Sequence, residues 1–455
     1  MKIYSCNTTR KAINIQHLIS AVGFLVCCSL SQAADNLPIT LSAEEDHRRS
    51  LDLLGIDQLR PGVDGNRQGE PGGVNYDEAL ANTYPRLPDP LLLNNRNKVT
   101  DADTWWQQRR PETIEMFDRE MYGRTPANLP GVTWEIEQQT NVTIAGLDAV
   151  KHTLTGKVDN TAYPAIEINI KAILVLPRQS NEPVPVMVQL IIEPFMTRYQ
   201  EMAQEPGSWQ SLLLEKGWGY AYLDTYTVQE DSGAGFTRGI IGLVNHGQAR
   251  NLDDWGVLKA WGWGASRLLD YFETSPAVDA TRVGIEGHSR WGKAALVTMA
   301  YDQRFAIGYI SSSGSGGAKL HRRNFGEIVE NNAGTSAYHW MGINYLKYAG
   351  PLSWDDLPVD AHQLIALSAP RPLFIGAGHE GDFWVDPKGM FLAAANAQPV
   401  YALLGAKTME TMDFPPLENG LMEGEIAFRQ HAQGHTDRPN WPAFIEYAAR
   451  YLDKP

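Results

Sequence analysis

Hydrophobic residues are spaced differently in successive parts of this chain. Between residues 132 and 176 apolar and polar positions alternate, most regularly over 165–170, as in antiparallel strands with one exposed face. After residue 184 short apolar runs take over, separated by helix-like stretches such as 253–273 and the segment after Gly292. The apolar runs predict strands at 184–192, 219–223, 282–286, 306–310 and 372–376.

Strands that alternate with crossover helices build a mostly parallel sheet with helices on both faces. We therefore predict an α/β fold with a mostly parallel central sheet flanked by helices, and not a β-sandwich. No internal repeat or low-complexity tract is visible, so residues 101–455 are expected to form a single domain.

The N-terminal part has a different composition. Residues 34–100 are rich in Pro, Gly, Asn and Asp, which predicts an extended segment that wraps the domain. Residues 1–33 resemble a bacterial secretory signal, with a basic start, an apolar run over 18–30 and a cleavage point after Ala33. Because Cys28 follows Cys27 and not a small residue, a lipid anchor is the weaker alternative.

Composition indicates an exported globular protein. The chain has 455 residues, 43% hydrophobic and 20% charged, enough for a large core. All three cysteines lie in the leader, so the exported chain depends on that core and not on disulfides. Loss of three leader cations changes the formal charge from −14 to −17, which argues against nucleic acid and anionic membranes as partners. No later apolar stretch is long enough to span a bilayer, so we expect a secreted or periplasmic protein.

The apolar run at 282–286 leads into the motif Gly-His-Ser-Arg-Trp-Gly-Lys at 287–293, which continues into a helix-like stretch. A serine on a sharp strand-to-helix turn is typical of the nucleophile elbow of α/β-hydrolases. Such a turn exposes the Ser289 hydroxyl above the sheet and points the Arg290 N–H at the place where an acyl oxyanion forms. Gly292 comes one position later than in the usual Gly-x-Ser-x-Gly pattern.

A hydrolase of this fold carries its acid and its histidine after the nucleophile. The strand predicted before residue 377 ends in a loop with three carboxylates, Glu380, Asp382 and Asp386. His435 lies in a loop just before the last helix-like stretch, 441–452, where the general base belongs. An imidazole activates a serine when a carboxylate fixes its tautomer, so these residue types are needed together.

His431 and His435 also have the spacing of a metal-binding pair. Gly434 interrupts any helix there and no third ligand is nearby, so we predict no metal site. His431 is interpreted as a surface or core residue.

Four motifs together resemble the glucuronoyl esterases of carbohydrate esterase family 15. The similarity runs from about Trp105 to the end and includes the elbow with its late glycine, together with motifs at 322–327, 338–341 and 382–389. The resemblance implies an α/β-hydrolase fold without a cofactor. It also implies roles for five residues: Ser289 as nucleophile, Arg290 in the oxyanion hole, Lys293 and Glu327 on sugar hydroxyls, and Trp384 against the uronate ring.

Two of these positions can be weighed on the residues alone. Lys293 lies one helical turn beyond Ser289 and can share its face. Cations are disfavoured at a helix N-terminus unless an anion compensates, so Arg290 and Lys293 indicate function more than solvated charge. Trp340 either lines the same cleft or is a buried core residue.

One position departs from the family. Many members, the fungal ones especially, carry the triad acid shortly after the elbow, in a Glu-Ser-Gly-Ser-Gly-Gly stretch. The corresponding run here begins with Ser312, which has no charge. Some bacterial members place an acid after the later strand, at the position of Asp382. We therefore predict Asp382 as the triad acid, with Asp386 and Glu380 as alternatives.

These expectations combine into one hypothesis. An exported monomer cleaves the ester between glucuronic or 4-O-methylglucuronic acid of glucuronoxylan and lignin alcohols, using Ser289, His435 and Asp382. The alternatives are an acetylxylan or feruloyl esterase, or a peptidase, on the same triad, and a non-catalytic carbohydrate-binding protein on the hydrolase fold. The two cations of the elbow together with Glu327 favour a uronate over an acetyl group.

Overall fold

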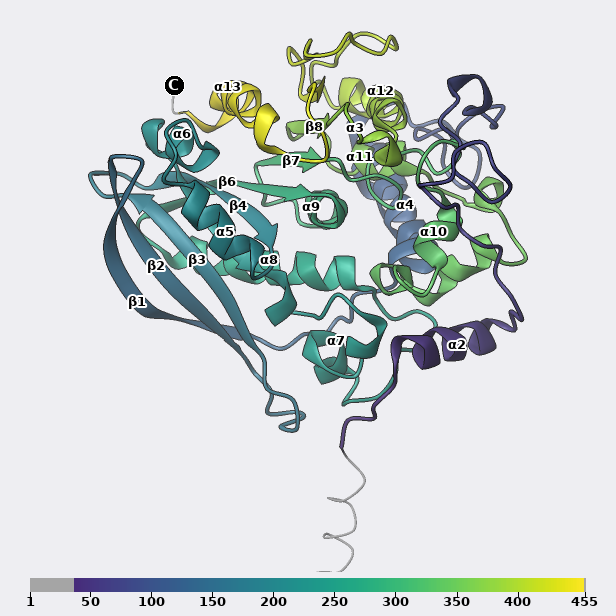
Figure 1. Ribbon diagram of the computed structural model, residues 1–455, viewed down its shortest axis with the longest axis horizontal. Helices are drawn as coiled ribbons and strands as arrows, with labels where there is room; N and C mark the ends of the chain where they lie inside the picture. Colours follow the sequence, from purple (N-terminus) through teal and green to yellow (C-terminus); the bar gives the residue numbers. More distant parts are fainter. Residues whose placement is uncertain (1–36, 454–455) are drawn as a thin grey trace, which may run out of the picture.

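A nine-stranded sheet runs through the computed structural model, which describes residues 37–453 (Figure 1). The strand order is β1-β2-β3-β5-β4-β6-β7-β8-β9. Pairing is antiparallel from β1 to β5 and parallel from β5 to β9, which confirms the predicted α/β fold. The strands are β1 (Val132–Ile144), β2 (Leu147–Val158), β3 (Asn169–Pro177), β4 (Val184–Ile191), β5 (Gly219–Asp224), β6 (Val278–His288), β7 (Ile307–Ser311), β8 (Leu373–Ala377) and β9 (Ile426–Gln430).

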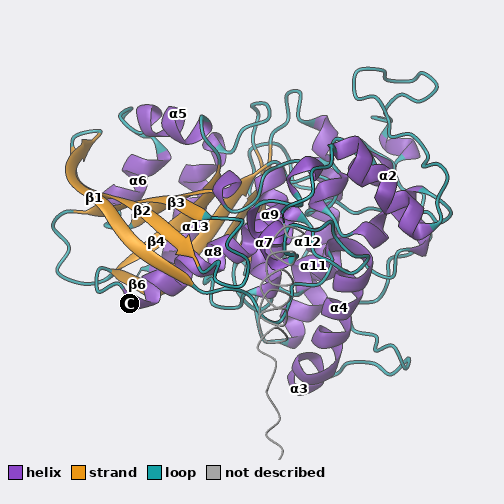
Figure 2. Ribbon diagram, turned by 90° about the horizontal axis from the view of Figure 1, so that it is seen from below, coloured by secondary structure: helices purple, strands orange, loops and turns teal. Residues whose placement is uncertain are grey.

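Helices cover both faces of the sheet (Figures 1 and 2). Alternate residues of β4 point to opposite sides: Val188 joins one hydrophobic cluster with α8, α9, α11 and α12, whereas Met187 joins another with α5, α6 and α13. β4 is buried along its whole length for this reason. The helices are α2 (Ala43–Leu54), α3 (Ala102–Thr104), α4 (Arg110–Phe117), α5 (Phe195–Met202), α6 (Trp209–Glu215), α7 (Gly239–Val244), α8 (Val257–Thr274), α9 (Arg290–Tyr301), α10 (Val329–Ala333), α11 (Ala361–Ala366), α12 (Pro387–Leu403) and α13 (Trp441–Leu452).

Some elements differ from the expected ranges. The helix expected at 253–273 begins only at Val257, because Asp254 accepts the Asn251 N–H at 2.7 Å in a turn before it. Strand β9 was not anticipated. Its five residues carry Arg429 and Gln430 among apolar neighbours, and pairing with β8 is what makes them a strand.

The N-terminal segment contains the helix α2 and otherwise turns and loops that pack against the domain. Its residue Asn75 accepts the Gly326 N–H at 3.0 Å, and Glu78 pairs with Arg323 at 2.8 Å. The segment is thereby fixed beside the loop that carries Glu327. The predicted signal peptide, residues 1–33, lies outside the described residues. Within residues 37–453 no helix is both long and apolar enough to cross a membrane.

Candidate active site

Strand β6 and helix α9 meet at a sharp turn that carries Ser289. This residue has φ 59° and ψ −125°, a conformation rarely adopted by residues other than glycine. β6 ends at His288 and α9 begins at Arg290, so the turn is a single residue. The turn has the geometry of a nucleophile elbow, with the helix starting earlier than the sequence suggested. Its hydroxyl stands at the carboxyl ends of the parallel strands, where α/β enzymes bind their ligands.

Two glycines make this turn possible. A Cβ at Gly287 would lie 2.1 Å from the carbonyl oxygen of Trp291, and a Cβ at Gly292 would lie 2.7 Å from that of Ser311. The late glycine therefore marks the place where α9 crosses the end of β7. The Ser289 N–H donates to the same Ser311 carbonyl at 2.9 Å, which fixes the elbow to the sheet.

The loops after β8 and β9 bring Asp382 and His435 together. Asp382 Oδ1 lies 2.6 Å from His435 Nδ1. The other carboxylate oxygen accepts the Gly378 N–H and the Ser312 hydroxyl, each at 2.7 Å. Burial raises the pKa of Asp382, but these partners outweigh burial and the pKa lies below its usual value. The ionised carboxylate favours the tautomer with hydrogen on Nδ1 and leaves Nε2 free to accept a proton.

The other two acids of the β8 loop lie elsewhere. Asp386 is buried, pairs with Arg323 at 2.7 Å and accepts the Gly389 N–H at the start of α12. Glu380 is exposed. Of the three predicted candidates, the structure brings Asp382 alone to His435.

Two further histidines border the catalytic loop. The ring of His288 lies 4.3 Å from that of His435, and its Nδ1 is 3.0 Å from Ser311 Oγ. Burial lowers the pKa of His288 to about 3, so this ring is neutral at ordinary pH. His431 is buried, and its Nε2 lies 2.8 Å from the Thr436 carbonyl, which closes the turn around His435.

Asp231 fixes the side chain of Arg290. The Arg290 guanidinium lies 2.6 Å from Asp231, whose side chain is only 3% exposed. The second oxygen of Asp231 is 2.8 Å from His339 Nε2 and accepts the Trp340 indole N–H at 2.7 Å. Burial raises the pKa of Asp231, but its partners bring it down to about 2. The charged carboxylate thus holds a guanidinium beside the elbow.

Lys293 and Glu327 form a buried ion pair. Lys293 Nζ lies 2.9 Å from Glu327 Oε2, with side chains 4% and 9% exposed. The Ser315 N–H donates to the same carboxylate oxygen at 3.0 Å. Burial lowers the pKa of Lys293. The Trp340 ring lies 5.4 Å from Lys293 Nζ and 5.3 Å from the Arg290 guanidinium carbon, so this buried tryptophan stands between the two cations.

Trp384 lies next to Glu327. Its carbonyl accepts the Glu327 N–H at 2.8 Å. A Cβ at Gly65 would lie 3.0 Å from the Trp384 ring, so the N-terminal segment passes directly over one part of the indole. The ring is partly exposed.

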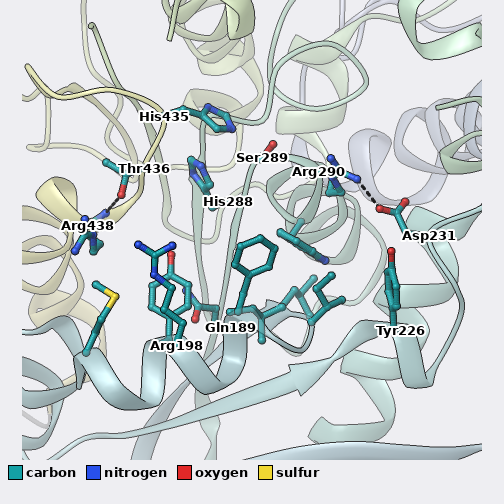
Figure 3. Close-up of a pocket in the computed structure, with 17 residues that line it drawn as sticks. Gln189, Arg198, Tyr226, Asp231, His288, Ser289, Arg290, His435, Thr436 and Arg438 are labelled. Carbon is teal, nitrogen blue, oxygen red and sulfur yellow. Dashed lines mark hydrogen bonds and ion pairs between the residues drawn. The ribbon is translucent and has the colours of Figure 1, made fainter. Parts of the chain in front are cut away.

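A cavity of about 480 Å³ opens beside the elbow and is lined by Ser289, Arg290 and His435 (Figure 3). The Ser289 hydroxyl and the His435 ring face the same opening in Figure 3. No hydrogen bond between them is present in the described part of the chain. Catalytic hydrogen bonds are often loose in proteins without a ligand and tighten with substrate. Lys293, Glu327, Trp340 and Trp384 are not among the residues that line this cavity.

Comparison with known proteins identifies the family. The model of the family described as glucuronyl esterase, fungi, matches residues 247–405. A carbohydrate esterase from an unknown prokaryotic organism is 31% identical over 415 residues, which cover 84% of this chain and 93% of that protein. A glucuronoyl esterase of family 15 from Teredinibacter turnerae superposes with a TM-score of 0.85 and 45% identity, covering 90% of this chain and 99% of that one. The chain belongs to carbohydrate esterase family 15. A glucuronoyl esterase from Solibacter usitatus is also similar, with a TM-score of 0.74, 32% identity and coverage of 83% and 100%.

Two residues beside the elbow of this family 15 esterase escaped the sequence reasoning. Asp231 lies in a loop after β5 with no motif to mark it, and only the fold brings it to Arg290. His288 is next to Ser289 in sequence, and this adjacency was a signal that could have been used. Its contact with His435 depends on the loop after β9, which only the fold places there.

Proposed function

We propose that this family 15 esterase hydrolyses the ester between glucuronic or 4-O-methylglucuronic acid of glucuronoxylan and an alcohol of lignin. One observation carries the proposal. Ser289, with its positive φ, and His435 line the same cavity, and His435 Nδ1 lies 2.6 Å from the buried carboxylate of Asp382. This combination supports acyl transfer through a serine nucleophile.

In the proposed reaction His435 removes the proton from Ser289 as its hydroxyl attacks the ester carbonyl of the uronate. Asp382 keeps the imidazole in the reactive tautomer and stabilises its charged form. The imidazolium then protonates the departing alcohol. Water, activated by the same histidine, attacks the acyl-enzyme and releases the free uronate.

Arg290 supports the oxyanion in this scheme. Its N–H is at the first position of α9, where no partner exists within the helix. Its guanidinium is held in place before the reaction begins, because Asp231 already pairs with it. Preorganised charge at the site of developing charge is usually the largest single contribution to such catalysis.

The uronate, which is the acid half of the ester, is proposed to bind next to Lys293, Glu327 and Trp384. Glu327 Oε2 is occupied by Lys293 and Ser315, which fixes the carboxylate and leaves its second oxygen for a sugar hydroxyl. The exposed part of the Trp384 ring offers an apolar face to sugar C–H groups. Trp340 contributes by packing its ring against the side chains of Arg290 and Lys293.

We further propose that the enzyme is exported through the predicted signal at residues 1–33 and acts as a monomer. Extracellular glucuronoxylan is too large to enter a cell, which supports export for the proposed substrate.

The test compares benzyl glucuronate with nitrophenyl acetate as substrates of the wild type and of Ser289→Ala. We expect efficient cleavage of the uronate ester by the wild type and its loss in Ser289→Ala. Cleavage of the acetate alone would refute the substrate. Binding of glucuronoxylan without cleavage of either ester would refute the enzymatic function.

A further inference from the structure

The cavity beside Ser289 extends from Arg290 to His435, and its contact with His435 tells which half of an ester it holds. A general base that takes the serine proton must later deliver it to the leaving alcohol, so the alcohol oxygen lies within reach of His435. His435, Thr436 and Arg438 line the cavity, whereas Lys293 and the side chains associated with it do not. The inference therefore rests on the proposed function, which places the uronate on the other side.

Aromatic and aliphatic side chains form much of the cavity wall. Phe195 and Tyr226 are 44% and 43% exposed, which is unusual for large apolar residues in this core-rich chain. Phe195 packs edge-on against Trp291 with ring centroids 6.1 Å apart. Exposed aromatic rings around a concave site are typical of ligand pockets. A volume of about 480 Å³ is large enough for a substituted aromatic ring.

Two arginines give the same cavity a positive end. Arg198 from α5 and Arg438 from the turn before α13 line the wall away from the pair of Arg290 and Asp231 (Figure 3). No ion pair in residues 37–453 involves the guanidinium of either one. Asp231 is the sole carboxylate among the lining residues, and Arg290 already occupies it.

Asp437 is buried beneath this end, and its oxygens bond to other groups than the two arginines. Its oxygens accept from neutral groups, the Trp441 indole N–H at 3.1 Å, the Tyr199 hydroxyl at 3.3 Å and the Gln189 amide at 3.4 Å. Burial raises the pKa of Asp437, and the nearby positive charge of Arg438 opposes this rise. Arg198 and Arg438 thus give this end of the cavity a local positive charge, although the chain as a whole has a formal charge of −14. A local charge of this kind attracts a ligand of the opposite sign.

We propose that this cavity is the subsite for the leaving alcohol and that it selects aryl-alkyl alcohols bearing a negatively charged group, such as a carboxylate on the ring. The ring of the alcohol packs on the exposed side of Phe195, and Arg198 and Arg438 bind the anion. In the reaction the ester C–O bond breaks, the alcohol oxygen takes the proton from His435, and the charged alcohol leaves through the open cavity.

The test uses three esters of methyl-protected glucuronic acid, with benzyl, para-carboxybenzyl and para-(aminomethyl)benzyl alcohol. The measured quantity is the ratio of kcat/KM for each charged ester to that for the benzyl ester. We expect the carboxybenzyl ester to exceed the benzyl ester by about tenfold, which corresponds to about 1.4 kcal/mol, and the aminomethyl ester to fall below it. The preference is expected to shrink in high salt, because exposed charges are screened.

Variants that remove the charge of the two arginines test whether these residues cause the preference for the carboxybenzyl ester. In Arg198→Gln with Arg438→Gln the carboxybenzyl-to-benzyl ratio is expected to fall to about one, with each single change giving an intermediate ratio. Arg178→Gln is the matched control and should keep the wild-type ratio. Arg178 is exposed and follows β3, which ends beside the amino ends of the parallel strands and therefore far from Ser289.

The outcomes separate this inference from the proposed function. If the wild type cleaves the benzyl ester but prefers no anionic alcohol, or if the double variant keeps the preference, the subsite is refuted and the esterase function stands. If none of the three uronate esters is cleaved, the proposed function fails and the subsite with it.

Discussion

Replacing Asp382 by Asn is the sharpest test of the catalytic geometry. Asp382 Oδ2 accepts the Gly378 N–H, a backbone donor that cannot reverse its direction. The Asn oxygen must therefore stay on that side, and its NH₂ group must face His435 Nδ1. His435 would then accept at Nδ1 and carry its hydrogen on Nε2, toward Ser289, where it cannot act as a base.

The expected loss follows from that tautomer. The equivalent change in a serine protease triad lowers kcat by about 10⁴-fold, which is about 5.4 kcal/mol of transition-state stabilisation. The substrate contacts proposed for Lys293, Glu327 and Trp384 are untouched, so KM should change little. Steady-state kinetics with benzyl glucuronate measures both constants.

The two neighbouring acids are the controls. Asp386→Asn leaves the buried Arg323 without its principal partner and is expected to cost about 3–5 kcal/mol of folding free energy, measured by chemical denaturation. The folded fraction should still turn over substrate. Glu380→Gln, at an exposed position, should leave both activity and stability near wild type. The reasoning is refuted if Asp382→Asn keeps kcat within tenfold of wild type, or if the folded Asp386→Asn protein is the inactive one.

Three other predictions follow from the same structure. Asp231→Asn should lower kcat by about tenfold to a hundredfold with the fold intact, because Arg290 loses the anion that positions it; an unchanged kcat in a folded protein would remove Arg290 from the oxyanion site. Burial holds the pKa of Glu286 well above its usual range. Above about pH 4.5 the folded state therefore keeps a proton that the unfolded state releases. The free energy of unfolding then falls by up to about 1.4 kcal/mol for each pH unit. Glu286→Gln should therefore flatten the fall of stability against urea as the pH rises above about pH 4.5, and an equal slope in both proteins would contradict this. Lys293→Met and Glu327→Gln should each cost about 3–5 kcal/mol in chemical denaturation because each leaves a buried charge unpaired, whereas the double change should cost less than the sum; additive costs would show that the two are uncoupled.

Local sequence patterns were sufficient to predict the parallel sheet and the elbow. The apolar runs identify β4 to β8 because strands buried on both faces carry few polar residues. The elbow can be recognised because the strand, the serine and the helix are contiguous in the chain. Chain order also pointed to the loops after β8 and before α13, since this fold places its acid and histidine there.

The choice between Asp382 and Asp386 required tertiary structure. Both carboxylates follow β8 within nine residues, and local sequence gives them the same chemistry. They differ because Asp386 meets Arg323 and caps α12, whereas Asp382 meets the loop after β9, a strand whose pattern was not recognised. Ser312 illustrates the same point, because the absence of a charge was visible in the sequence but its hydrogen bond to Asp382 was not.

The sequence by itself therefore determined the fold class and the motif around Ser289, because periodicity and contiguous turns depend on neighbouring residues. The tertiary structure decided which carboxylate reaches His435, that Asp231 holds Arg290, and that Arg198 and Arg438, which form no ion pair within residues 37–453, line the cavity near His435. The first two are contacts between residues 53 and 59 positions apart in the sequence. They depend on how strands and loops are ordered across the sheet, which no local pattern specifies.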